Sequence, residues 1–226
     1  MIEDIKKWLI ENSDNKLSEF SSSLIPNSLQ IIGVKIPVLR NKAKEIIKGD
    51  YELFLKECDD SSLEICLLEA YVIGTAKMTK EKRALYLDKF IPKIQDWAVN
   101  DGLVSSLKCI KNDYQFWFHY LLKYQDSSKE FEVRFLLITL MSYYLTDEYI
   151  DLTIEVVKKV KVNAYYSKMG LAWFLATALA KQEVKIIALL EECLFDKEVI
   201  TMTISKIRQS FRISDEMKEY VLKYKN

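Results

Sequence analysis

Hydrophobic residues recur at helical spacing along almost the whole chain. In the first segment, one apolar face is formed by Ile2, Ile5, Trp8 and Leu9. Spacings of three and four residues are typical of an amphipathic helix. The same periodicity predicts further helices over 37–48, 50–57, 61–76, 80–89, 90–110, 113–124, 129–145, 147–160, 163–181, 183–193, 196–210 and 214–224. We therefore expect consecutive helices joined by short breaks.

Several of the breaks contain residues that begin or interrupt helices. The Asp-Ser-Ser sequence at 60–62 and the Asn-Asp pair at 112–113 are candidate N-caps, because their side-chain oxygens can accept a hydrogen bond from an exposed backbone N–H. Helices with an acidic first turn are expected to begin at 146–148 and 214–216, since the positive end of a helix favours acids. The one long irregular stretch, 23–37, contains Pro26, Gly33 and Pro37.

The composition supports an all-helical fold and sets its size. The 226 residues suffice for one domain, or one short repeat array, over 1–226. Only 5 Gly and 3 Pro occur, whereas sheet-rich folds need many turn residues. Many helices with short turns fit either a helical bundle or an α-solenoid. Helix pairs that recur at roughly 35–45 residues have the HEAT-like period.

Charge and cysteine usage restrict the classes of function. Lys plus Arg equal Asp plus Glu, at 33 each. This balance argues mildly against tight nucleic-acid binding, although a basic cleft can coexist with an acidic back. His119 is the only histidine and no C-x-x-C pair occurs, so we expect neither a metal nor a cofactor. The cysteines, Cys58, Cys66, Cys109 and Cys193, lie in apolar helical stretches and indicate buried free thiols in a reducing cytosol.

The apolar segments are too short to cross a membrane. The longest, 135–141 and 169–180, fall below the ~18 residues of a membrane span and indicate buried helix interiors. The chain starts directly with a charged helix and shows no signal peptide. We expect a soluble, cytoplasmic protein that does not bind membranes.

Four polar or aromatic side chains stand out from the apolar background. Trp97 and Asp101 are four residues apart and would share one face of a helix. Arg134 lies in an apolar run, where a guanidinium must pair, stack or face a cleft. Trp173 lies in a second such run. Each also has a structural explanation: a core tryptophan, a structural ion pair or a helix cap.

These residues belong to five segments that resemble, in chain order, the motifs of one family. The segments are 32–40, 96–101, 132–135, 165–173 and 204–214. The first is a Gly-Val-Lys-Ile-Pro sequence that leads into a helix, and the second is an Asp-Trp pair followed by Asp101. Together they span nearly the whole chain, which is similar to the HEAT-repeat DNA alkylation repair family of AlkD-like DNA glycosylases.

The resemblance implies a fold, a reaction and a site. The fold would be a HEAT-like α-solenoid, a curved α-α superhelix with a concave cleft for double-stranded DNA. The reaction would be hydrolytic excision of cationic N3- or N7-alkylated purines such as 3-methyladenine and 7-methylguanine. By position, Asp101 matches the catalytic carboxylate, and Trp97, Arg134 and Trp173 match the residues of the cleft.

These residue types suit that reaction. An alkylated purine already carries positive charge and leaves without a general acid. A nearby carboxylate can stabilise the oxocarbenium-like sugar and orient the attacking water. Tryptophan faces attract cations, and an arginine can hold a phosphate next to the lesion.

Two basic clusters could supply phosphate contacts. One surrounds a single acid, Glu45, and consists of Lys35, Arg40, Lys42, Lys44 and Lys48. The other contains Lys206, Arg208 and Arg212. Such clusters are also found on solvated faces. The DNA-binding candidates among them are Lys35, Arg40, Lys206, Arg208 and Arg212.

Two other functions fit the same pattern. The first is a non-catalytic HEAT-like protein that recognises unusual DNA structures. The second is a protein-binding scaffold, since helical solenoids present long surfaces to peptides. A mainly acidic or apolar concave face would favour the scaffold. The sequence indicates no particular protein partner.

Overall fold

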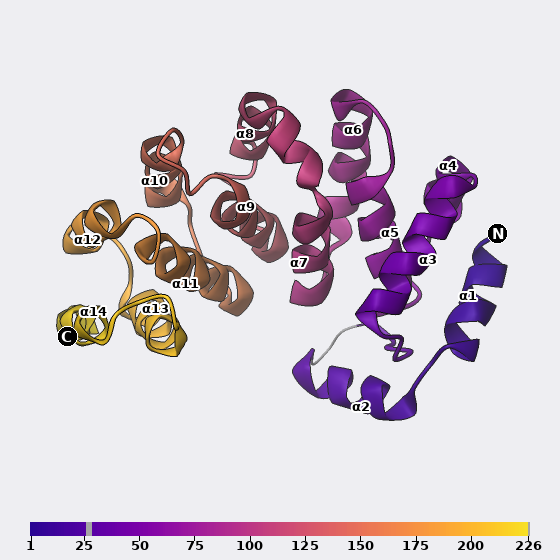
Figure 1. Cartoon of the computed structure of the whole chain (residues 1–226), viewed down its shortest axis with the longest axis horizontal. Coiled ribbons are helices and arrows are strands. Elements are labelled where there is room, and N and C mark those ends of the chain that lie inside the picture. The colour runs from indigo at the N-terminus through magenta and orange to yellow at the C-terminus, as the bar shows by residue number, and fades with distance from the viewer. Residues whose placement is uncertain (26–28, 226) are drawn as a thin grey trace. The chain divides into compact units, whose positions relative to one another are not determined.

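A computed structural model describes residues 1–25 and 29–225, and every regular element in those ranges is a helix (Figure 1). The chain divides into two compact units, Met1–Asn112 and Asp113–Asn226. The helices of the first unit are α1 (Ile2–Glu11), α2 (Asn15–Leu24), α3 (Ile36–Lys48), α4 (Tyr51–Glu57), α5 (Leu63–Thr75), α6 (Lys80–Phe90) and α7 (Trp97–Ser106), with 3₁₀ turns at Ile91–Lys93 and Lys108–Asn112. The all-helical prediction is confirmed.

The second unit repeats this construction. Its helices are α8 (Tyr114–Leu122), α9 (Glu130–Tyr143), α10 (Ile150–Lys159), α11 (Tyr165–Leu179), α12 (Glu183–Glu191), α13 (Lys197–Gln209) and α14 (Asp215–Tyr220), with a 3₁₀ turn at Val221–Lys225. In the first unit α5 packs between α3 and α7, and in the second α11 packs between α9 and α13 (Figure 1). Along the series α3, α5, α7, α9, α11 and α13, consecutive helices begin 27 to 35 residues apart, at or below the lower end of the expected period. The arrangement is compatible with a helical solenoid.

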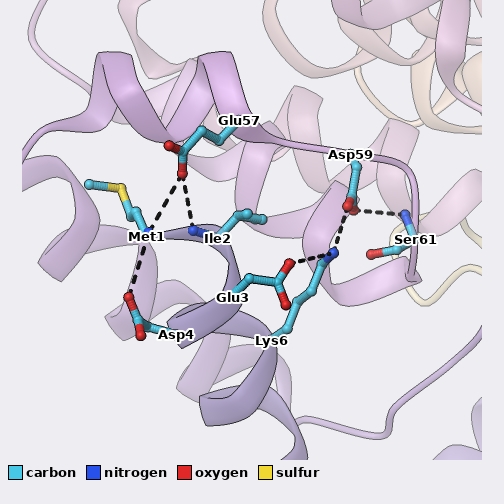
Figure 2. Close-up of polar contacts among 8 residues, drawn as sticks. All are labelled: Met1, Ile2, Glu3, Asp4, Lys6, Glu57, Asp59 and Ser61. Carbon is cyan, nitrogen blue, oxygen red and sulfur yellow. Dashed lines mark hydrogen bonds and ion pairs between the residues drawn. The ribbon is translucent and has the colours of Figure 1, made fainter.

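Three helices, α5, α9 and α11, are buried on nearly every side. In α5 every residue from Leu63 to Gly74 is buried, and α9 is buried from Val133 to Met141. Such helices lack a polar face, which is the pattern of a helix enclosed by neighbours. Helix α1 is held at the periphery by polar contacts. Lys6 Nζ lies 2.7 Å from Asp59 Oδ2, and the backbone N–H of Ile2 donates to Glu57 (Figure 2).

Side-chain caps confirm three of the expected helix starts. Ser62, Asp113 and Ser214 each accept a hydrogen bond from the backbone N–H three residues later. The expected start at 146–148 is wrong. There the N–H groups of Tyr149 and Ile150 both bond to the carbonyl of Thr146, which makes a turn before α10.

One other helix prediction needs correction, and one helix was missed. The span 90–110 is not one helix. A 3₁₀ turn containing Pro92 ends at Lys93, and the Asp96 carboxylate then caps α7 by accepting from Val99 N. Helix α2 was not predicted. Its apolar residues Leu17, Phe20 and Leu24 have helical spacing, but none of its residues is fully buried.

The irregular segment before α3 is held by one buried carboxylate. Glu64, 2% exposed, accepts hydrogen bonds from the N–H groups of Ile32, Gly33 and Val34. Gly33 has φ +94°, and a Cβ there would lie 2.4 Å from the carbonyl oxygen of Asp14. Glycine is therefore required at this position. Pro26, also expected in this stretch, lies outside the described residues.

The cysteines only partly match the expectation of buried thiols. No disulfide joins them. Cys66 is buried, and burial raises the pKa of its thiol to about 12. Cys58 and Cys109 are half-buried, and burial raises the pKa of both. Cys193 is exposed, because it lies in the turn after α12 with φ 53°, so the expectation is wrong for this residue.

A second buried acid, Glu69 on α5, lies near Cys58. Its Oε2 atom has no hydrogen-bond partner within the described residues. Burial raises the pKa of Glu69 to about 7, and nearby Asp60 adds to the rise, while Lys93 and the Cys58 hydrogen bond oppose it. The side chain therefore binds its proton more tightly in the folded protein than in the unfolded chain.

We expect this proton to make stability depend on pH. Because the folded pKa lies above the unfolded value of 4.5, the free energy of unfolding should fall as pH rises from about 4.5 to about 7. Urea unfolding at about pH 5 and about pH 8 measures this fall. Glu69→Gln should make it smaller, whereas Glu81→Gln, at an exposed glutamate, should leave it unchanged. An equal fall in the Glu69→Gln variant would contradict the assignment.

Candidate nucleic-acid interface

One face of α7 carries the candidate residues of the first unit. Trp97, Asp101 and Ser105 follow one another at intervals of four residues, so they share a face. Trp97 is half-buried, and its Nε1 donates to the carbonyl of Leu24 at the end of α2 over 3.4 Å. Asp101 is also half-buried. The shared face expected from the sequence is therefore present.

Arg40 is brought to this face by α3 and α5. Its Nη2 donates to Ser105 Oγ over 2.8 Å, and its Cζ lies 4.4 Å from the ring centroid of Tyr71 on α5. Helix α7 approaches α5 closely at Gly102, where a Cβ would lie 3.0 Å from Leu67 Cδ2. Helices α3, α5 and α7 thus place the Arg40 guanidinium at Ser105, one turn of α7 beyond Asp101.

Asn100 is a site residue that the sequence did not reveal. It is fully buried, and its Nδ2 donates to Asp101 Oδ1 over 2.9 Å. A buried amide that donates to a carboxylate restricts the orientation of that carboxylate. The available signal was a second polar residue on the buried side of α7, directly before Asp101.

Trp173 lines a groove in the second unit. Its side chain is 41% exposed. The groove has a volume of about 610 Å³ and is lined by Met141, Ser142, Trp173, Ala176, Thr177, Ala180, Lys181, Lys206, Gln209, Ser210 and Arg212. No acidic residue is among them. Trp173 is therefore a surface residue, and two of the predicted basic residues, Lys206 and Arg212, lie in the same groove.

Arg134 is almost fully buried, whereas a side chain that lines an open cleft would be more exposed. It is 4% exposed, and its Nη1 donates to the carbonyl of Tyr166 over 3.0 Å. Its aliphatic part packs beside Gly170, where a Cβ would lie 3.5 Å from Arg134 Cγ. The side chain thus joins α9 to the first turn of α11.

The remaining basic candidates are dispersed. Lys35 is exposed at the N-cap of α3. Arg208 is exposed and lines a separate hollow of about 410 Å³ that also includes Lys225. The structure therefore groups Trp97, Asp101 and Arg40 in the first unit, and Trp173, Lys206 and Arg212 in the second. Convergence of the two groups on one surface stays a prediction.

Residues 1–25 and 29–225 contain neither a cluster of metal-ligating side chains nor a membrane-spanning helix. No group of three or more His, Cys, Asp or Glu side chains is placed to hold a metal ion there. No helix in the same ranges has both the length and the apolar character to cross a membrane.

Comparison with known proteins identifies the family. No curated protein and no solved structure is significantly similar to this chain. The family model described as DNA alkylation repair enzyme matches residues 5–209, which include both groups of candidate residues. The resemblance seen in the sequence motifs is confirmed. The chain belongs to the DNA alkylation repair enzyme family, and this membership supports a role in DNA repair.

Proposed function

We propose that the protein is a DNA N-glycosylase that hydrolyses the glycosidic bond of cationic N3- or N7-alkylated purines in double-stranded DNA. The observation that carries the proposal is the face of α7, where the Asp101 carboxylate lies one turn from the half-buried Trp97 and is held by buried Asn100. The family match supports the repair role. We take residues 1–226 as one functional domain, because the match extends over both units.

The carboxylate would act on charge that develops in the transition state. As the bond to the alkylated purine breaks, positive charge grows on the sugar. Asp101 would stabilise this charge and orient or deprotonate the attacking water. The cationic purine leaves as a neutral base, so the reaction needs no general acid. Neutral lesions should be poor substrates for the same reason.

The other candidate residues would bind the substrate. Trp97 and Trp173 would present their ring faces to the cationic base or the sugar edge. Arg40, Lys206 and Arg212 would neutralise phosphates, and Lys35 and Arg208 would extend these contacts. We propose that Arg134 also contacts a phosphate, and its bond to the Tyr166 carbonyl would fix the guanidinium for this.

The direct test is release of free base. The purified protein is incubated with duplex DNA that was methylated chemically, and the released 3-methyladenine and 7-methylguanine are measured by mass spectrometry. We expect both bases to appear in proportion to time and to protein concentration. Tight binding of the methylated duplex without any released base would reject the enzyme and leave a non-catalytic DNA-binding protein.

That second function has an observation in its favour. The groove of the second unit is lined by a solvent-exposed tryptophan and by cations, and no acidic residue lines it. A surface of this kind suits nucleic-acid binding and needs no catalytic group. The same observation disfavours a protein-binding scaffold, for which an acidic or apolar surface was expected. A cytoplasmic location stays a prediction.

DNA binding should depend on salt through the basic candidates. Each neutralised phosphate contributes about 0.9 to the slope of log affinity against log salt concentration. The triple variant Lys206→Ala, Arg208→Ala, Arg212→Ala should therefore flatten this slope by about 2 to 3 units for duplex DNA. Fluorescence anisotropy at several salt concentrations measures the slope.

A matched variant separates local contacts from total charge. Lys7, Lys89 and Lys161 are exposed and lie outside both groups of candidate residues. Their replacement by alanine removes the same charge and should leave the slope nearly unchanged. Equal flattening by both triple variants would show that only the net charge matters.

A further inference from the structure

The groove of the second unit contains a cation that the family motifs do not include. The groove lies where α9, α11 and α13 end, and its walls come from all three helices and from the connection after α13. Lys181 is exposed just after the end of α11 and lines the groove together with Lys206 and Arg212. Three cations therefore surround one volume of about 610 Å³.

These three cations differ from lysines of the same unit that form ion pairs with nearby acids. In the described ranges no ion pair involves Lys181, Lys206 or Arg212. By contrast, ion pairs join Lys158 to Glu192 and Lys185 to Asp151. The three helix C-termini at the groove each carry about half a negative charge. They therefore offset only part of the positive charge of the three cations. A net positive field remains, which suits a phosphate.

A fully exposed phenylalanine, Phe211, lies in the chain between two residues of the groove and is not itself one of its lining residues. Phe211 follows Ser210 and precedes Arg212, both of which line the groove. Its side chain is 103% exposed, the highest value among the exposed large hydrophobic residues. The N–H of Arg212 donates to Ser210 Oγ over 3.2 Å and closes a tight turn around the phenylalanine. Full exposure forgoes about 1.5–3 kcal/mol of burial, so packing within the described chain does not explain this ring.

We propose that this groove binds an unpaired nucleotide of DNA, with backbone phosphates on Lys181, Lys206 and Arg212 and the base stacked on Phe211. The proposal rests on the proposed function in taking DNA as the ligand. A base inside a duplex has both faces covered by its neighbours, so an exposed ring can stack only on a base that has left the helix or lies in a single strand. Stacking on an aromatic side chain tolerates every base, because each has a π face.

The test compares unpaired with paired DNA. One probe is a fluorescein-labelled oligothymidylate of about twelve residues, and the other is a labelled duplex closed by a hairpin at each end, which offers no unpaired terminus. Phe211→Ala should weaken binding of the oligothymidylate about tenfold, which corresponds to the loss of one stacked base. Binding of the closed duplex should change less than about twofold, and Phe211→Trp should restore the affinity for the oligothymidylate.

Matched controls define the contribution of each group. Phe20 is another exposed phenylalanine, 61% exposed on α2, and Phe20→Ala should leave both affinities unchanged. Lys181→Ala should reduce the salt slope for the oligothymidylate by about 0.7, the value for one phosphate of a single strand. Lys161→Ala, which removes an exposed lysine outside the groove, should not alter that slope.

Three results would overturn the proposal: wild-type affinity of Phe211→Ala for the oligothymidylate, an equal loss for both probes, or equally strong competition by oligoglutamate of the same charge. Base release from methylated duplex DNA is measured separately. If the wild type releases no base but binds the oligothymidylate through Phe211, the proposed glycosylase fails and the groove assignment stands. If base is released and Phe211 has no effect on binding, only the groove assignment fails.

Discussion

Asp101→Asn is expected to slow base release from methylated duplex DNA by about 10²–10³-fold, which corresponds to about 3–4 kcal/mol of transition-state stabilisation. The carboxylate would stabilise positive charge that grows on the sugar only while the bond breaks. An amide keeps the shape of the side chain and loses this charge. The effect should therefore appear in the rate and leave DNA affinity within about threefold of the wild type.

The local structure favours a clean interpretation of this variant. Asp101 is half-buried, and its Oδ1 accepts a hydrogen bond from Asn100 Nδ2. The Oδ1 atom of an asparagine can accept the same bond. The cap of α7 belongs to Asp96 instead. The helix should therefore keep its start and its stability after the substitution.

Single-turnover kinetics with methylated duplex DNA measures the rate, and thermal unfolding checks the fold. Asp126→Asn removes the same charge at an exposed position in the second unit and should retain the wild-type rate. A wild-type rate for Asp101→Asn would refute the catalytic role. A drop of many degrees in Tm would instead assign Asp101 a structural role.

The sequence predicts the three most buried helices well because burial controls their pattern. Helices α5, α9 and α11 are apolar on nearly every side, so their existence and approximate bounds follow from the hydrophobic runs. Helix α2 escapes such reasoning because it has no fully buried residue and so no long apolar run. A clear local signal for its start is Asp14, whose carboxylate accepts from the N–H groups of Lys16 and Leu17.

Only part of the candidate site can be predicted from local sequence patterns, because its other contacts join residues far apart in the chain. The spacing of Trp97 and Asp101 fixes their shared face, because both lie in one helix. The bond from Arg40 to Ser105 joins positions 65 residues apart, and no local pattern predicts it. The same holds for the carbonyl partner of Arg134, which depends on how α9 packs against α11.

Glu64 shows why a buried acid is difficult to recognise from sequence. It lies in the first turn of α5, where an acid is ordinarily explained by the helix dipole. Its actual partners are the backbone N–H groups of the segment that precedes α3. That segment in turn holds α2, because the carbonyl of Gly33 accepts from Asp14 N and the carbonyl of Ile31 accepts from Ser18 Oγ.

Glu64→Ala is expected to lower the free energy of unfolding by about 3–5 kcal/mol. The substitution removes the acceptor for the N–H groups of Ile32, Gly33 and Val34, two of which are in buried bonds. Each buried donor that loses its partner costs about 1–3 kcal/mol. For a chain of this length, the change corresponds to a fall in Tm of about 10–15 °C.

Urea unfolding and thermal unfolding measure this loss. Glu45→Ala provides the control, because Glu45 forms an exposed pair with Lys42, and such pairs contribute at most about 1 kcal/mol. A Glu64→Ala variant as stable as the control would contradict the role of the carboxylate.

The effect should also reach the candidate site. Once the segment is released, α2 loses its support, and with it the Leu24 carbonyl that holds the Trp97 indole. Base release should then fall at temperatures below the unfolding transition, whereas the Glu45→Ala protein keeps its activity up to that transition.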